Sequence, residues 1–187
     1  NNKSNSFINY ITHLITFTVM IRYIKIGLCG LYNIWFYTLA ATGIIISLPL
    51  FFIFCFKEEW YPQFYWVARN IWAKLILFGM GLIPKIEFSE PLLKGKNYML
   101  TANHKSMIDV MLMLQISKNP IVFVGKKELV ELPVFGFFYK RVCILVDRES
   151  PESRKAVYGH AQRRLNQGLS LCIFAEGLVT APEIKLA

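Results

Sequence analysis

A long uncharged stretch near the start of the chain dominates the hydrophobic pattern. Residues 26–56 form a run of 31 positions without a charged side chain, and about 20 apolar residues are enough for a helix to cross a bilayer. The run therefore predicts a membrane helix, which could kink at Pro49. A shorter apolar stretch at residues 7–21 could be a second membrane element or a helix on the membrane surface.

Residues 64–82 show a different pattern, in which apolar and aromatic side chains surround most of the helix and Arg69 and Lys74 interrupt them. This mixture is typical of a helix that lies in the membrane interface with its basic groups at headgroup level. An ordinary core helix is the alternative interpretation.

Short apolar runs alternate with helical patterns after Pro84. The runs at residues 98–102, 121–124, 142–146 and 169–174 predict strands, and the stretches at 107–116 and 151–166 predict helices. Alternation of this kind predicts an α/β fold with a mainly parallel sheet flanked by helices. We therefore expect a helical membrane anchor over residues 1–83 and an α/β domain over residues 84–187.

Composition and charge support this division. Hydrophobic residues make up 55% of the 187 positions, charged residues make up 18%, and the net charge is +9. So much apolar surface excludes a disordered chain. A basic and apolar chain suits membrane lipids with anionic headgroups, and the basic residues are too scattered to favour nucleic acid. Residues 1–57 carry no acidic side chain, whereas residues 97–187 carry twelve basic and eight acidic ones.

The four cysteines, Cys29, Cys55, Cys143 and Cys172, form no C-x-x-C pair and have no histidine at a metal-ligand spacing. We expect buried, reduced thiols and no metal site.

Polar residues follow each predicted strand. They are His104, Lys126, Arg148, and the pair Glu176 and Gly177. Ligands of open α/β sheets bind beyond the carboxyl ends of the strands, so parallel neighbouring strands would gather these residues around one cleft. Polar loops that carry no function are the alternative.

Ser106 and Asp109 have the S-x-x-D spacing of a capping box, which predicts a helix that starts at Met107. If His104 lies in the loop before this cap, it can fold back so that Asp109 accepts a hydrogen bond from one imidazole nitrogen. The other nitrogen would then face the cleft as a base.

Three segments resemble the conserved blocks of the glycerolipid acyltransferases. They are NHKSMID at residues 103–109, GKKELVELPVFGFFYKRVCILVDRES at 125–150, and CIFAEG at 172–177. Within that family the chain is similar to the bacterial 1-acylglycerol-3-phosphate acyltransferases, and a hydrophobic N-terminal anchor is also typical of the family.

The resemblance implies a role for each candidate residue. His104 would be the general base that deprotonates the acceptor hydroxyl, and Asp109 would orient it. Arg148 would bind the acceptor phosphate or shape its site, with Lys126 as a second candidate. Glu176 and Gly177 match the third block. The hydroxyl would attack the acyl thioester directly, and no G-x-S-x-G nucleophile motif is present.

The third block departs from the family pattern. The family reads Glu-Gly-Thr-Arg, whereas Leu178 and Val179 follow Gly177 here, and valine cannot clamp a phosphate as arginine does. The fourth block of the family is absent before Ala187. We therefore expect a C-terminally truncated domain that lacks a strand and is weakly active or inactive, although its parent would be active.

The sequence thus predicts an enzyme that transfers a fatty acyl group from acyl-CoA or acyl carrier protein to lysophosphatidic acid, making phosphatidic acid without a further cofactor. The alternatives are the same transfer to another lysolipid, and a truncated, inactive membrane protein. We expect the catalytic domain on the cytoplasmic face of a bacterial inner membrane, with an organellar membrane as the alternative; the oligomeric state is not predicted.

Overall fold

The computed structural model describes the backbone of residues 2–175 and the side chains of residues 16–175. Its internal contacts divide the chain into two units, Asn1–Leu39 and Ala40–Ala187. The anchor boundary predicted between residues 83 and 84 stays a prediction.

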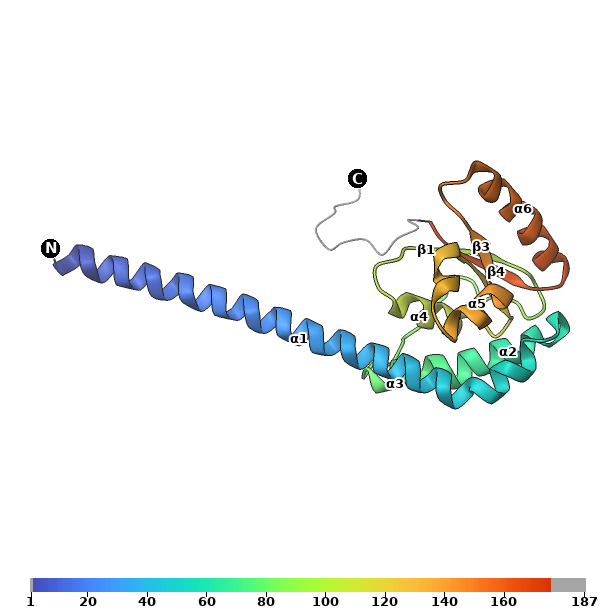
Figure 1. Cartoon of the computed structure of the whole chain (residues 1–187), viewed down its shortest axis with the longest axis horizontal. Helices are drawn as coiled ribbons and strands as arrows, with labels where there is room; N and C mark the ends of the chain where they lie inside the picture. The colour runs from blue at the N-terminus through green and yellow to red at the C-terminus, as the bar shows by residue number, and fades with distance from the viewer. Residues whose placement is uncertain (1, 176–187) are drawn as a thin grey trace. The chain divides into compact units, whose positions relative to one another are not determined.

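One continuous helix, α1 (Asn2–Phe54), contains both apolar stretches of the N-terminal region (Figure 1). The idea of a separate element at residues 7–21 is therefore wrong, because the charged residues between the stretches, Arg22 and Lys25, continue the helix. Its segment Thr16–Phe54 is long and apolar enough to cross a membrane. One helix of this kind is weak evidence of membrane association, since a core helix or a signal sequence has the same properties.

The last turns of α1 belong to the second unit and pack through one face. Gly43, Ser47 and Phe51 recur every four residues and are buried. A side chain at position 43 would collide with Trp72, because its Cβ would lie 2.7 Å from the indole Cδ1. The ring of Phe51 stacks on Phe64 at a centroid distance of 4.6 Å.

A second helical stretch follows a short 3-10 turn, η1 (Glu58–Trp60). It comprises α2 (Tyr61–Val67), a π-helical turn η2 (Ala68–Trp72) and α3 (Ala73–Gly79). The Tyr61 hydroxyl donates to Ile121 O at 2.7 Å, and the Tyr65 hydroxyl donates to Ser117 O at 2.8 Å. One face of residues 64–82 therefore packs on the α/β part, as expected of a core helix, because the buried Tyr65 bonds to its backbone. Trp66 and Phe78 of the same stretch are exposed, and its interfacial interpretation stays a prediction.

Four parallel strands form one sheet in the order β1-β4-β2-β3. The strands are β1 (Met99–Ala102), β2 (Ile121–Lys126), β3 (Ile144–Val146) and β4 (Ser170–Phe174). Ala102 pairs with Phe174, and Phe123 pairs with Cys172. The predicted α/β fold with a parallel sheet is thus confirmed, and each predicted strand is present within two residues of its expected bounds.

Helices cover both faces of this sheet. The crossovers through α4 (Ile108–Ile116) and α5 (Phe135–Val142) step in one direction across the strand order, whereas the crossover through α6 (Pro151–Asn166) steps back. Because such crossovers are right-handed, α6 lies on the face opposite to α4 and α5 (Figure 1). The sequence had not predicted α5, nor the 3-10 turn η3 (Lys127–Glu131) before it.

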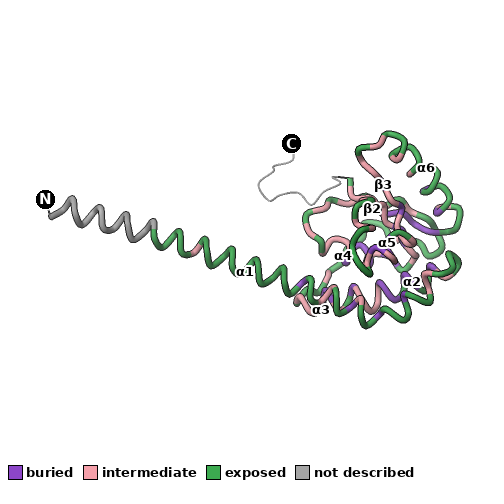
Figure 2. The backbone as a smooth tube through the Cα atoms, viewed as in Figure 1, coloured by how far each residue is buried: buried purple, intermediate pink, exposed green. Residues whose placement is uncertain are grey.

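Buried residues concentrate in the sheet and in the helices that touch it (Figure 2). Ile121, Val122, Leu171 and Cys172 are fully buried, as is Ile76 of α3. This core holds the strands in place, and their carboxyl ends therefore have fixed positions relative to one another.

All four cysteines are free thiols. Cys172 is buried, and burial raises the pKa of the Cys143 and Cys172 thiols to about 12. Cys29 is exposed on α1, so the expectation of a buried thiol is wrong there. The apolar run around Cys29 comes from the surface of α1 and not from a protein core.

Candidate active site

The carboxyl ends of all four strands meet at one edge of the sheet, because the strands are parallel. His104 lies two residues after β1, Lys126 is the last residue of β2, and Arg148 lies two residues after β3. Glu176 and Gly177, which follow β4, lie outside the described residues, as do Leu178 and Val179. β4 lies between β1 and β2, so its end is flanked by the loop of His104 and by Lys126.

The turn between β1 and α4 is organised by one carboxylate. Oδ2 of Asp109 accepts hydrogen bonds from the backbone N–H groups of Lys105 at 2.6 Å and Ser106 at 2.8 Å. The Ser106 hydroxyl accepts from the N–H of Ile108 at 3.2 Å. α4 begins at Ile108, one residue later than predicted, with Met107 as its N-cap. A carboxylate in the first turn also interacts favourably with the helix dipole.

The same carboxylate oxygen holds His104. Nδ1 of the imidazole lies 3.3 Å from Oδ2 of Asp109, and both side chains are largely buried. A carboxylate only accepts hydrogen bonds, so Nδ1 is the donor in this contact, and in the neutral imidazole this tautomer leaves the lone pair on Nε2. The expected contact between these two side chains is therefore present, and it leaves the nitrogen that a general base needs.

An aromatic ring fixes the plane of the imidazole. Phe174, at the end of β4, stacks on His104 with a centroid distance of 4.2 Å and an interplanar angle of 19°. Phe123 of β2 lies beside Phe174 at 6.3 Å. Sequence reasoning missed Phe174, because its position under His104 depends on the pairing of Ala102 with Phe174 between strands about 70 residues apart.

Lys126 and Arg148 lie farther along the same edge, at the ends of β2 and β3. Lys126 faces Glu128 with 3.5 Å between Nζ and Oε1. Arg148 is half-buried, and its carbonyl accepts a hydrogen bond from Arg154 at 3.1 Å. Within residues 16–175 no hydrogen bond or ion pair joins either cation to His104. The structure thus brings His104 and Asp109 together and leaves the two cations as separate groups along the edge.

Tyr139 of α5 is a second residue that the sequence did not single out. Its hydroxyl packs so closely on Gly125 that a Cβ at position 125 would lie 1.8 Å from the phenolic oxygen. Burial raises the pKa of Tyr139 well above its usual value, and the nearby Arg148 opposes this shift. Tyr139 therefore stays protonated at physiological pH and supports the backbone at the end of β2.

No group of three or more histidine, cysteine, aspartate or glutamate side chains lies close enough to hold a metal ion in the part of the chain that the structure describes. The geometry around His104 suits proton transfer: the imidazole is largely buried, Nδ1 is held, and Nε2 has no hydrogen-bond partner among residues 16–175.

Curated proteins similar to this chain are acyltransferases. A probable 1-acyl-sn-glycerol-3-phosphate acyltransferase of Mycoplasma pneumoniae is 29% identical over 87 residues, which are 44% of this chain and 33% of that protein. The 1-acyl-sn-glycerol-3-phosphate acyltransferase of Helicobacter pylori is 30% identical over 80 residues, covering 42% and 34%. The enzyme of that name from Cocos nucifera is 26% identical over 110 residues, covering 58% and 35%.

The matched region thus spans about a third of the length of these relatives. No solved structure gives a significant match. The family model described as Acyltransferase matches residues 84–184, more than half of the chain. That range contains the four strands, the His104 loop and both cations, and the chain therefore belongs to the Acyltransferase family.

Proposed function

We propose that this chain carries the catalytic part of an acyltransferase that esterifies the free hydroxyl of 1-acylglycerol-3-phosphate. The observation that carries the proposal is the His104–Asp109 pair at the carboxyl ends of parallel strands, with Nδ1 held and Nε2 free. Relatives with the printed name 1-acyl-sn-glycerol-3-phosphate acyltransferase support the acceptor.

The reaction needs one proton acceptor and no covalent enzyme intermediate. Nε2 of His104 takes the proton of the acceptor hydroxyl while the hydroxyl oxygen attacks the carbonyl carbon of the acyl thioester. The thioester is acyl-CoA or an acylated acyl carrier protein. The new C–O bond forms, the C–S bond breaks, and the thiolate takes the proton from the imidazolium. Asp109 accepts the hydrogen bond from Nδ1 and stabilises the imidazolium.

Lys126 and Arg148 are the proposed phosphate ligands. They lie at the ends of β2 and β3 on the edge that carries His104, and guanidinium and ammonium groups bind phosphate strongly. Glu176 and Gly177 complete the proposed acceptor site after β4.

The proposed setting is a membrane, because the acceptor and the product are amphiphiles and α1 has the length and composition of a membrane span. We place the catalytic part on the cytoplasmic face of a bacterial inner membrane, where acyl thioesters are available.

Exchange of the proposed base tests the reaction. We expect His104→Ala to lower kcat by a factor of about 100 or more, in line with the loss of a general base, while leaving the fold intact. His160→Ala is the matched control, because His160 is an exposed histidine on the opposite face in α6. Mass-spectrometric detection of phosphatidic acid measures turnover, and undiminished turnover in His104→Ala refutes the assignment.

The acceptor is tested separately with Arg148→Gln. We expect this change to raise KM for 1-acylglycerol-3-phosphate and to leave KM for a phosphate-free lysolipid unchanged, because only the former offers a phosphate. If the unaltered protein prefers the phosphate-free acceptor, or if Arg148→Gln affects both acceptors equally, another lysolipid is the substrate.

A further inference from the structure

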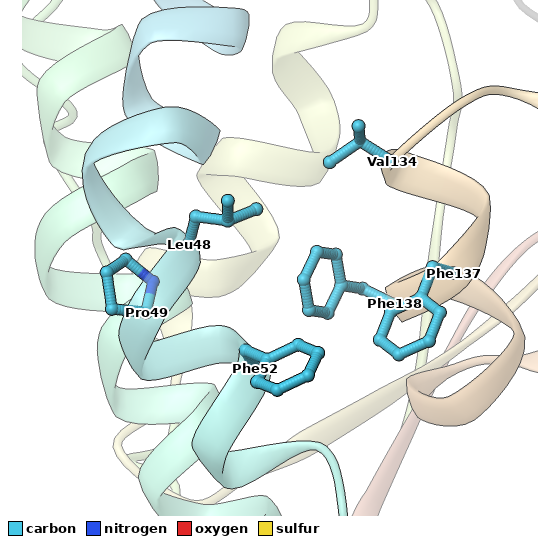
Figure 3. Close-up of a pocket in the computed structure, with 6 residues that line it drawn as sticks. All are labelled: Leu48, Pro49, Phe52, Val134, Phe137 and Phe138. Atoms are coloured by element: carbon cyan, nitrogen blue, oxygen red, sulfur yellow. The ribbon is translucent and has the colours of Figure 1, made fainter.

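An apolar cavity of about 350 Å³ lies between the last turns of α1 and the start of α5 (Figure 3). It is lined by Leu48, Pro49, Phe52, Val134, Phe137 and Phe138. None of these residues belongs to the strand ends around His104. Figure 3 shows Leu48 and Phe52 projecting from α1 towards Val134 and Phe138.

The inner part of the cavity is formed by buried side chains, and its opening, called the rim below, is formed by exposed ones. Phe138 is buried and packs on Phe51 with 5.8 Å between ring centroids. At the rim, Phe52 is 51% exposed and Val134 is 56% exposed, and Leu132 beside them is 48% exposed. Exposed apolar surface that continues into an apolar cavity marks an interaction site.

Val134 is held in a strained backbone conformation at this rim. It is the one non-glycine residue with positive φ among the described residues, with φ 62° and ψ −57°. The N–H of Phe135 donates to Pro133 O at 2.6 Å, which makes this a classic γ-turn, a rare and strained form. Such a conformation is unfavourable for a β-branched residue, yet the side chain of Val134 is exposed.

A cation borders the same cavity. The guanidinium carbon of Arg141 lies 3.8 Å from the ring centroid of Phe137, and its Nη1 donates to Phe137 O at 2.8 Å. No carboxylate within residues 16–175 lies in ion-pair distance of Arg141. An apolar slot with an unneutralised cation at its edge matches an anionic headgroup attached to a hydrocarbon chain.

One wall of the slot belongs to the helical segment that could cross a bilayer. Leu48, Pro49 and Phe52 belong to Thr16–Phe54, the segment with the length and composition of a membrane span. At 1.5 Å per residue this segment is about 58 Å long, roughly twice the 30 Å thickness of the hydrocarbon core. A crossing therefore uses only part of the helix and leaves turns near one end for the headgroup region.

We propose that this slot docks one acyl chain of an anionic phospholipid of the bilayer, with Arg141 beside its phosphate. The α/β part is then attached to the membrane through the segment from Leu132 to Arg141 as well as through α1. The inference does not depend on the acyltransferase reaction, since it uses no residue of the His104 site.

Depth-dependent fluorescence quenching tests the docking. The full chain carrying Val134→Trp is reconstituted in phosphatidylglycerol-containing vesicles whose acyl chains are brominated. We expect the fluorescence added by this tryptophan, over the background of the four native ones, to be largely lost. Tyr158→Trp is the matched control, because Tyr158 is 79% exposed on α6, and its added fluorescence should persist.

A second probe and a charge variant complete the test. Leu132→Trp reports on the same rim without altering the strained residue, in case Val134→Trp does not fold. Arg141→Gln in either probe background should reduce the preference for anionic over neutral vesicles, whereas Lys155→Gln on α6 should not. The proposal is overturned if the tryptophans at the rim and on α6 are quenched equally, or if the rim tryptophan is not quenched. It is also overturned if only a brominated soluble acyl donor quenches the rim tryptophan, or if Arg141→Gln leaves the preference for anionic vesicles unchanged.

Discussion

His104 is positioned by groups from two different elements. Asp109 of α4 fixes the Nδ1 atom, and Phe174 of β4 fixes the plane of the ring. Asp109 is itself held by two backbone N–H groups, from Lys105 and Ser106. Because these two hydrogen bonds hold the carboxylate in place, the imidazole keeps Nε2 directed away from Asp109 without help from the substrate.

The stacking of Phe174 on His104 predicts how substitutions of Phe174 change turnover. Phe174→Leu removes the stacking, which is worth about 0.5–1.5 kcal/mol for aromatic pairs, so we expect kcat to fall roughly 2- to 10-fold with little change in KM. Phe174→Tyr keeps the ring and should retain activity. Steady-state kinetics measures both, and NMR of the His104 ring protons should show an upfield ring-current shift that only the leucine variant loses.

An equal effect of both variants would contradict a positioning role for the ring. The NMR readout stays informative even if the acyl acceptor differs from the one proposed, because it reports on the imidazole and needs no substrate.

At the scale of elements, the position of α5 depends on a close backbone contact between Gly136 and Val130. A Cβ at Gly136 would lie 1.9 Å from Val130 O, so only glycine lets the start of α5 fold back onto the turn before it. Tyr139 on the same helix then reaches Gly125 of β2. Two glycines thus set the distance of α5 from the preceding turn and from the sheet.

Matched glycine exchanges test this account. Gly136→Ala should lower the free energy of unfolding by about 1–3 kcal/mol or more, because the new methyl group meets backbone that cannot move aside. Gly159→Ala lies in the middle of α6 with nothing within 4 Å, and should raise it by up to about 1 kcal/mol through helix propensity. Urea unfolding measures both; if Gly136→Ala were stabilised as Gly159→Ala is, helix propensity alone would govern position 136.

The contrast between α5 and α6 shows what the sequence can and cannot predict. α6 was predicted with its observed bounds because every signal is local: the Ser150 hydroxyl caps the N–H of Ser153, Pro151 starts the helix, and Gly168 follows it at φ 83°. α5 was missed because it is short, aromatic and contains Gly136, so tertiary contacts decide its conformation.

Contacts in the candidate site also divide into those that local sequence predicts and those that depend on tertiary structure. The S-x-x-D spacing predicted the contact of Asp109 with the His104 loop, because capping acts over a few residues. The stacking of Phe174 on His104 requires the strand order β1-β4-β2-β3, which short-range patterns do not specify. The pattern of residues 64–82 did not separate its two interpretations for a related reason: an aromatic and basic helix has the same pattern on a membrane and on a sheet.

At the scale of the whole molecule, a surface carboxylate joins segments about a hundred residues apart. Glu58 of η1 accepts hydrogen bonds from Arg163 and, at 3.0 Å, from Gln167, and Arg164 lies 4.0 Å away. The hydrogen bond from Gln167 and the neighbouring arginines hold the pKa of Glu58 below its usual value. This contact links η1, the turn after α1, to the C-terminal end of α6.

This link predicts a pH dependence. A carboxylate whose pKa is lowered on folding contributes stability at neutral pH, and the contribution is lost as pH falls through the lowered value. Glu58→Gln should therefore cost about 0.2–1 kcal/mol at pH 7 and converge with the unaltered protein in acid. Glu59→Gln, beside it and without an ion pair in the described part of the chain, is the control in thermal unfolding across pH. A difference that persists in acid would mean that packing, and not charge, is responsible.

The place of β4 in the sheet has a consequence for synthesis on the ribosome. β4 follows all other described strands along the chain, yet it lies between β1 and β2. Until residues 170–174 leave the exit tunnel, β1 has no partner strand and His104 has no ring beneath it. The arrangement of His104, Asp109 and Phe174 is therefore complete only after β4 has been synthesised and has paired with β1 and β2.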